Sequence, residues 1–154
     1  MNRLAALLTG AWFGMQLMAG YIAVPILFRY LNKIMAGQIA GELFAIVAYF
    51  GLFAWAVAYV TIRTAIVEYG RYNPRTTTGL NGIGAMLLLL SINQFFVTPV
   101  IDALKHNQHH WLHDWLSGSF AVWHGVSSSI YLLCSILGGA LLFYYLHFFA
   151  PKAR

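Results

Sequence analysis

The sequence has very few charged residues: Asp, Glu, Lys and Arg make up 8% of its 154 residues. Soluble globular domains carry roughly 25% charged residues, so this composition excludes an ordinary soluble domain. A hydrophobic fraction of 60% and a mean hydropathy of +0.69 indicate an integral membrane protein instead. The length leaves room for one transmembrane domain over residues 1–154 and for no separate soluble domain.

Cysteine and the common catalytic motifs are also scarce. The single cysteine, Cys134, cannot form an intrachain disulfide and leaves the redox compartment open. The chain lacks a phosphate-binding loop and a dinucleotide-binding fingerprint. His124 and Ser127 have no acidic residue beside them to complete a hydrolytic triad, and the first three predicted spans hold no histidine that could join His124 as a haem ligand. We therefore expect a protein that is not an enzyme.

Four apolar segments are long enough to cross a bilayer as helices, which takes about 20 residues each. They are predicted at about 4–31, 36–63, 79–101 and 119–149. The first segment is expected to be retained, because its apolar run exceeds that of a signal peptide. The connections between the segments are short. The sequence therefore predicts an all-α integral membrane protein, an up-and-down bundle of four transmembrane helices.

Small residues recur at four-residue steps on the first two predicted spans, a spacing that lets neighbouring helices approach closely. Two prolines fall near the ends of the first and third spans, where they should kink or stop the helix. The predicted helix-packing residues are Gly10, Gly14, Gly37, Gly41, Pro25 and Pro99.

The basic residues predict the orientation of the bundle. One side of the predicted membrane carries Arg3, Arg63, Arg71, Arg75, Lys152 and Arg154, and the other carries Arg29, Lys33 and Lys105. Because cytoplasmic segments are enriched in Lys and Arg, both termini are expected in the cytoplasm, with the loop before the fourth span facing outward, which in a bacterium means the periplasm. The same role accounts for the net charge of +5 without a nucleic-acid partner.

Polar side chains fall at similar depths in the outer halves of the second, third and fourth predicted spans, when about 1.5 Å is counted per residue. They are His124, Glu42, Asn93, Ser127 and Gln94. Ionisable groups within spans are costly and usually functional, although buried polar groups also serve simply to join helices. We expect a polar pocket there that binds or passes a metal ion, a proton or a small solute. The alternative is an accessory or scaffolding subunit of a larger membrane complex, and either hypothesis accommodates a homo-oligomer.

The predicted outer loop carries an H-x-x-H-H-x-x-H pattern followed by an aspartate. On a continuous helix three of these histidines would share one face, a spacing that suits a divalent metal. The candidate ligands are His106, His109, His110, His113 and Asp114. Trp111 and Trp115 favour a short helix at the membrane interface instead. A Cu(I) site made of Met15, Met18 and Cys134 is a weaker alternative, because methionine usually fills apolar cores.

The segment from Trp12 to Phe44 resembles the N-terminal part of the transmembrane protein 205-like family; it reads WFGMQLMAGYIAVPILFRYLNKIMAGQIAGELF. In both, an apolar helix ends in a Pro-x-x-Phe step and an Ala-Gly start of the next helix precedes a Phe. The matching residues are Pro25, Phe28, Gly37, Gly41 and Phe44. Asn93 and Pro99 resemble the family's third helix, and WHGVSSSIYLL resembles its His-Gly-x-Ser motif. The resemblance implies a four-helix protein of the bacterial inner membrane; it implies no mechanism and does not extend to the histidine-rich loop.

Overall fold

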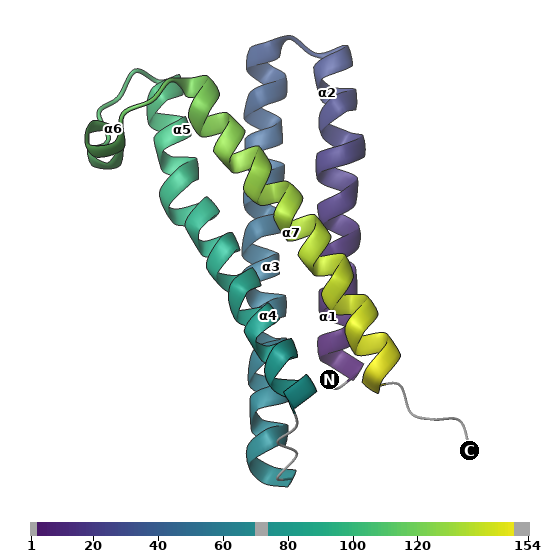
Figure 1. Ribbon diagram of the computed structural model, residues 1–154. Helices are drawn as coiled ribbons and strands as arrows, with labels where there is room; N and C mark the ends of the chain where they lie inside the picture. The colour runs from purple at the N-terminus through teal and green to yellow at the C-terminus, as the bar shows by residue number, and fades with distance from the viewer. Residues whose placement is uncertain (1–2, 70–73, 150–154) are drawn as a thin grey trace.

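The structure is a computed structural model that describes residues 3–69 and 74–149. Every regular element within these residues is a helix (Figure 1). Four helical spans are long and apolar enough to cross a membrane, which confirms the predicted all-α membrane fold. They cover Arg3–Tyr30, Lys33–Val67, Thr76–Lys105 and Phe120–Tyr145.

The first and third spans are each built from three consecutive elements. The first consists of α1 (Arg3–Leu17), the π-helix η1 (Met18–Ala23) and α2 (Val24–Tyr30). The third consists of α4 (Pro74–Ile92), the π-helix η2 (Asn93–Val97) and α5 (Thr98–Lys105). The remaining helices are α3 (Lys33–Tyr69), the short α6 (Trp111–Leu116) and α7 (Phe120–Phe149).

Both π-helices end just before a proline, Pro25 in α2 and Pro99 in α5. A proline has no N–H, and its ring would clash with the carbonyl four residues earlier in an α-helix. The backbone widens at these places, so that the N–H of Val24 donates to the carbonyl of Ala19 and that of Thr98 to Asn93. Neither proline therefore stops its helix, because the π-helical turn accommodates the ring.

The helices on either side of the predicted 64–78 connection are longer than predicted. α3 continues to Tyr69, and α4 begins at Pro74, which suits the first turn of a helix because its missing N–H would have no partner there. The Thr64 hydroxyl donates to the Val60 carbonyl at 3.0 Å, so this side chain is accommodated on the helix. Arg71, Lys152 and Arg154 of the orientation prediction lie outside the described residues.

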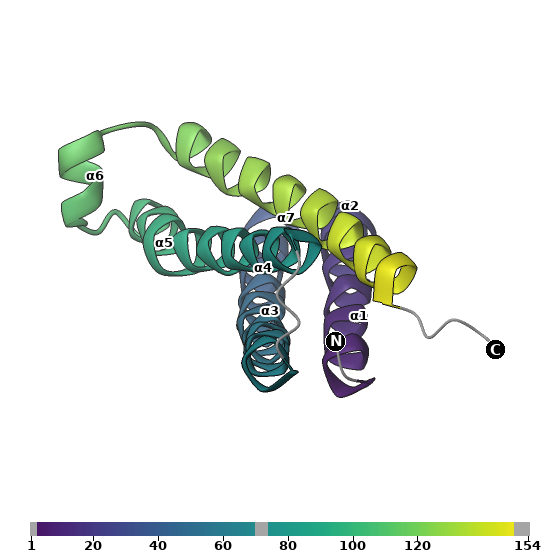
Figure 2. The ribbon, with the colours of Figure 1, turned by 60° about the horizontal axis from the view of Figure 1, so that its bottom comes forward.

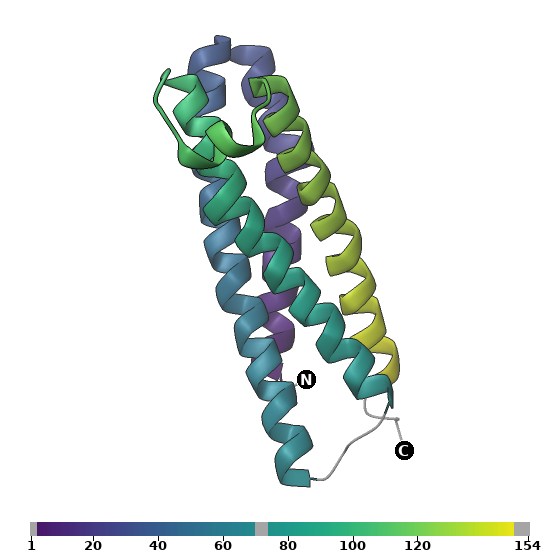
Figure 3. The same cartoon turned by 60° about the vertical axis from the view of Figure 1, so that its left-hand side comes forward.

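The four spans pack in a ring, in which α1 and α4 each contact both α3 and α7. α1 begins and α7 ends at one end of the bundle, whereas α6 and the α2–α3 turn lie at the other, the α6 end (Figure 3). α7 runs obliquely across the bundle: it lies beside α5 near the α6 end and beside α1 at the opposite end (Figures 1 and 2). The first half of α7, with its polar residues, is therefore placed next to the third span.

Two clusters of buried side chains hold the bundle together. The larger cluster surrounds Trp12, Trp55 and Met86 in the middle of the four spans. The smaller one lies at the α6 end and consists of Val97, Val100, Ile101, Leu112 and Trp123. Because Leu112 belongs to α6, this second cluster fixes the short helix against α5 and α7.

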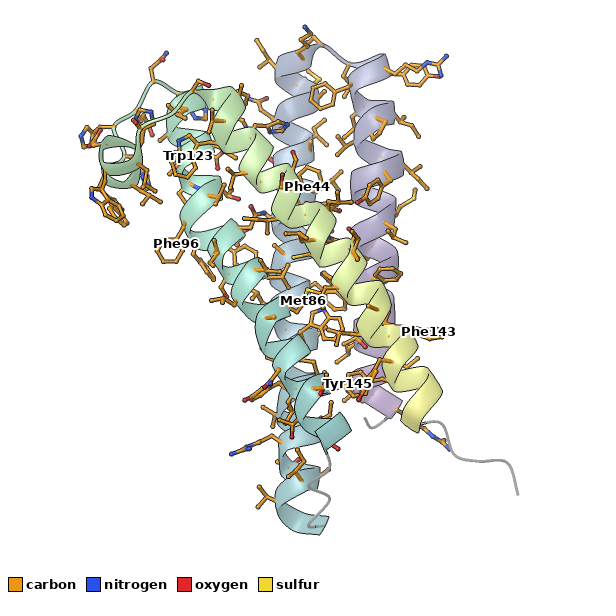
Figure 4. The ribbon with its side chains drawn as sticks, in the orientation of Figure 1. Phe44, Met86, Phe96, Trp123, Phe143 and Tyr145 are labelled. Atoms are coloured by element: carbon orange, nitrogen blue, oxygen red, sulfur yellow. The ribbon has the colours of Figure 1, made fainter. Side chains whose placement is uncertain are left out.

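Apolar side chains also cover the outside of the bundle. Figure 4 shows Met86 pointing in among the helices, and Phe96 and Phe143 pointing away from them. Phe96 and Phe143 are 48% and 70% exposed. An outer surface of this kind suits contact with lipid rather than water.

Candidate functional site

The histidine-rich segment does not form one continuous helix. α5 ends at Lys105, the chain turns through Asn107 in the left-handed region (φ 53°), and α6 starts only at Trp111. Asparagine tolerates this conformation better than most residues. The predicted shared face of His106, His110 and His113 is therefore absent, because the three residues belong to a turn, a helix cap and a separate helix.

Each histidine of this segment instead contacts a nearby group of α5, of α6 or of the loop that follows α6. His106 Nδ1 lies 2.9 Å from the Asp102 carbonyl, and His113 Nε2 lies 3.0 Å from that of Gly118. His110 Nδ1 accepts the Leu112 N–H at 3.3 Å and so caps α6. His109 Nε2 lies 2.6 Å from the Asp114 carboxylate. Among the described residues no three His, Cys, Asp or Glu side chains are grouped to hold a metal ion, so metal binding here stays a prediction that the fold does not favour.

A depression of about 480 Å³ opens beside this loop, between α3, η2 and α5, and is called the α5 depression below. Its polar lining consists of Gln94, Thr98, Asp102, His106, Gln108, His109 and His110. Its apolar lining includes Tyr49 of α3 and Phe95 of η2, whose rings meet edge to face with centroids 6.3 Å apart. The depression therefore joins an aromatic surface on the spans to a polar surface on the loop.

The five residues of the predicted polar pocket are placed on different surfaces. Glu42 and His124 are both exposed, and the His124 ring stacks on Phe120 with centroids 5.7 Å apart. Ser127 and Asn93 are half-buried. Gln94 is also half-buried and lines the α5 depression.

Helical register explains why Glu42 and His124 diverge. His124 is two turns before Tyr131, so both lie on the same face of α7, and the Tyr131 ring contacts Phe44 at 5.0 Å. Glu42 is two residues from Phe44, which places it about 200° away around α3. Glu42 therefore points away from the face of α3 that meets this face of α7. An enclosed pocket shared by the two side chains is not formed within one chain.

One fully buried amide side chain of the bundle was not among the predicted site residues. Gln16 of α1 is 1% exposed, and its amide donates to the Tyr131 carbonyl at 3.3 Å and to the Ser135 hydroxyl at 3.4 Å. In return the Tyr131 hydroxyl donates to the Gln16 carbonyl. Gly20 leaves room for the Tyr131 ring, since a Cβ there would collide with it. These bonds fasten α7 to α1 where the first span turns π-helical. The sequence feature that could have identified this residue is that Gln16 is the one amide in the first apolar segment.

Three buried polar atoms have no hydrogen-bond partner within the described residues. They are the Nε1 of Trp55, in the larger core cluster, the Nε1 of Trp123, in the smaller one, and the Oδ1 of Asn93, at the start of η2. Asn93 is placed one helical turn from both Leu90 and Val97, which are buried. Its side-chain oxygen therefore lies on the buried face of the third span, where it can still accept a hydrogen bond.

The glycines of the bundle divide into two groups. A Cβ at Gly51 would collide with the Trp12 indole, and one at Gly138 would lie 2.8 Å from the same ring, so these two glycines make room for Trp12. The predicted packing steps behave differently. A Cβ at Gly10, Gly14 or Gly37 would meet nothing within 4 Å, and one at Gly41 would reach only Lys105 Nζ at 4.0 Å. The glycine steps predicted for helix packing are thus not used for packing within this chain.

A family model described as "Domain of unknown function (DUF4149)" matches residues 7–110. The chain belongs to this family. No curated protein and no solved structure matches it. The resemblance to the transmembrane protein 205-like family stays a prediction.

The DUF4149 match covers the first three spans and ends at His110. It includes the four open glycines and the residues that line the α5 depression. It ends before α7, so Tyr131, Ser135 and His124 lie beyond the matched region. The matched region therefore comprises α1 to α5 and the loop as far as His110.

Proposed function

We propose that this DUF4149 protein is a non-enzymatic membrane subunit that assembles with the transmembrane helices of another chain. Two surfaces carry the proposal: the α1 face at Gly10 and Gly14, and the α3 face at Gly37 and Gly41. The observation behind it is the empty space around these four positions, where an added Cβ meets no packed neighbour in the chain. Glycines at a four-residue step are what allow two membrane helices to approach closely.

The energetics of glycine support this proposal. Each glycine within a helix destabilises it by roughly 0.5–1 kcal/mol relative to alanine, so four such residues destabilise the bundle by about 2–4 kcal/mol. At Gly51 and Gly138 the close contact with Trp12 offsets this destabilisation. At the four open glycines no contact within the chain offsets it. A helix from another subunit would offset it by van der Waals contact and by backbone Cα–H···O contacts.

A further part of the proposal concerns the setting of the subunit. We place it in the bacterial inner membrane with both termini in the cytoplasm, as the distribution of Lys and Arg favours. A cysteine introduced at Asn107, in a Cys134→Ser background, tests this in intact cells. A membrane-impermeant thiol reagent should label it from outside. Labelling only after the cells are opened would reverse the orientation.

The test of assembly uses bulky substitutions at the open glycines. Gly10→Leu and Gly14→Leu, made together, should block the α1 face, and the molar mass measured by light scattering in mild detergent should fall to that of one chain. Gly84→Leu is the matched control, because a Cβ at Gly84 also meets nothing within 4 Å but Gly84 is not part of either step.

Helix content measured by circular dichroism should stay unchanged in both variants, since a Cβ at each of these positions meets nothing within 4 Å. Co-purification from native membranes shows whether the partner is a second copy or a different protein. A wild-type protein that is monomeric and brings down no stoichiometric partner would contradict the proposal.

One observation, at Asn93, favours a second function. The buried Oδ1 of Asn93 has no donor within the described residues and is open to a ligand, water or proton donor. We infer a role in binding or passing a small solute, a proton or a metal ion in the third span, with His124 at the same end of the bundle. Asn93→Leu and His124→Ala should each lower solute uptake or metal tolerance while the protein remains in the membrane. Unchanged uptake in both variants would leave assembly as the function.

A further inference from the structure

The α5 depression has the layout of a site for an amphipathic molecule. At one end Tyr49 and Phe95 are 54% and 52% exposed on helices that span the membrane. At the other end lie the exposed residues Asp102, His106 and Gln108. The depression thus runs from a surface that faces lipid to one that faces the polar loop.

Its length can be compared with the layers of a bilayer. Phe95 and His106 both line the depression, and 11 residues of a helix span about 16 Å. The polar headgroup layer on each side of a bilayer is roughly 5–7 Å thick. A molecule that fills the depression therefore reaches past the headgroup layer into the hydrocarbon, which a free polar solute or a metal ion does not do.

The polar lining offers groups for both signs of charge. The Asp102 carboxylate is exposed and lies 3.4 Å from Lys105 Nζ, a long contact that leaves it able to accept from a second cation. In the neutral His110 ring Nδ1 accepts the Leu112 N–H, so Nε2 carries the proton and can donate. The amides of Gln94 and Gln108 add further donors. One carboxylate beside several neutral donors suits a ligand that has an ammonium and a phosphate.

We propose that the α5 depression binds one phospholipid with a primary-amine headgroup. The ammonium pairs with the Asp102 carboxylate at the polar end of the depression. The phosphate accepts from His110 Nε2 and from the glutamine amides. The first carbons of an acyl chain follow the Phe95 side of the depression into the membrane. This site is independent of the glycine faces and does not rest on the proposed function.

The test compares two lipids on delipidated, detergent-solubilised protein by native mass spectrometry. Phosphatidylethanolamine and phosphatidylglycerol with the same acyl chains are added at equal concentration. The wild type should bind one phosphatidylethanolamine and prefer it by about tenfold, the effect of one charge-assisted hydrogen bond. Asp102→Asn should remove this preference, and free phosphoethanolamine should bind at least about tenfold more weakly than the lipid, because it lacks the apolar contacts.

Gln38→Ala is the matched control. Gln38 lines a second open depression of about 410 Å³ at the same end of the bundle, so this variant should keep the lipid preference of the wild type. Circular dichroism confirms that Asp102→Asn and Gln38→Ala are folded. Equal binding of the two lipids by the wild type, a preference that survives in Asp102→Asn, or equally tight binding of the free headgroup would overturn the proposal.

Discussion

Trp12 gives the sharpest prediction about what holds this bundle together. Its side chain is fully buried, its Nε1 donates to the Val47 carbonyl at 3.1 Å, and its ring meets Trp55 edge to face at 5.6 Å. Gly51 of α3 and Gly138 of α7 give it room from two sides. We therefore expect Gly138→Ala to destabilise the protein, because the new methyl group would lie 2.8 Å from Trp12 Cζ3.

The magnitude follows from two opposing effects. An extra methyl group in a well-packed interior costs about 1–3 kcal/mol. Replacing glycine by alanine within a helix gains about 0.5–1 kcal/mol. Gly14→Ala has the second effect without the first, since a Cβ there meets nothing within 4 Å. The helix-propensity gain cancels between the two variants, so their difference in unfolding free energy isolates the overpacking cost of about 1–3 kcal/mol.

The assay is reversible unfolding in mixed micelles of a mild detergent and dodecyl sulfate, followed by circular dichroism at a protein concentration where the chain is monomeric. Gly138→Ala should unfold at a lower mole fraction of dodecyl sulfate than the wild type, and Gly14→Ala at the same or a higher one. If the two variants have equal stability, or Gly138→Ala is the more stable, Trp12 is not held between α3 and α7 as described.

The remaining predictions concern polar groups. Gln16→Leu should destabilise the bundle by about 0.6–2 kcal/mol through loss of its bonds to α7, and a Gln16 variant as stable as the wild type in the same unfolding assay would show that these bonds contribute nothing. Asn93→Leu should leave stability unchanged or raise it, because it removes a buried oxygen without a partner; a loss above about 1 kcal/mol would mean that this oxygen is hydrogen-bonded in the membrane. Calorimetric titration with Zn²⁺ should show no tighter binding for the wild type than for the His106→Ala/His110→Ala/His113→Ala variant, and a saturable site lost only in that variant would restore the metal prediction.

Much of the fold could be predicted from the sequence, because apolar length alone identifies a membrane span. The four spans are confirmed. Proline effects were harder to predict, because a missing N–H leads either to a helix end or to a π-helical turn. At Pro25 and Pro99 the backbone forms a π-helical turn. This turn needs neighbouring helices to support the widened backbone.

The use of each glycine could not be predicted, because it depends on which face of each helix turns inward. Gly10 and Gly14 form the clearest small-residue step in the sequence, yet they point out of the bundle. Gly51 and Gly138, in contrast, have no second glycine four residues away, yet they make room for the Trp12 ring. These helices are apolar on nearly all sides, because positions facing lipid and positions facing the core are filled by the same apolar residues. The sequence pattern therefore does not show which face turns inward.

The candidate site was only partly predictable for a related reason. Depth along a helix can be counted from the sequence, and this placed Glu42 and His124 near one end of the bundle. Rotation about the helix axis cannot be counted in the same way, and it separates the two residues. The shared face of the loop histidines requires one continuous helix, whereas α5 ends at Lys105 and the chain turns at Asn107, so their metal binding stays a prediction.

The most direct test of the assembly account is disulfide cross-linking in native membranes. Single cysteines at Gly10, Gly14 and, as control, Gly84, each in a Cys134→Ser background, are oxidised with copper phenanthroline. The account predicts rapid cross-linking at Gly10 and Gly14, to a second copy or to one partner protein that carries a cysteine at the contact, and none at Gly84. Cysteines at Gly10 and Gly14 that react only with a lipid-soluble maleimide, and form no cross-link, would show that lipid covers this face and would contradict the account.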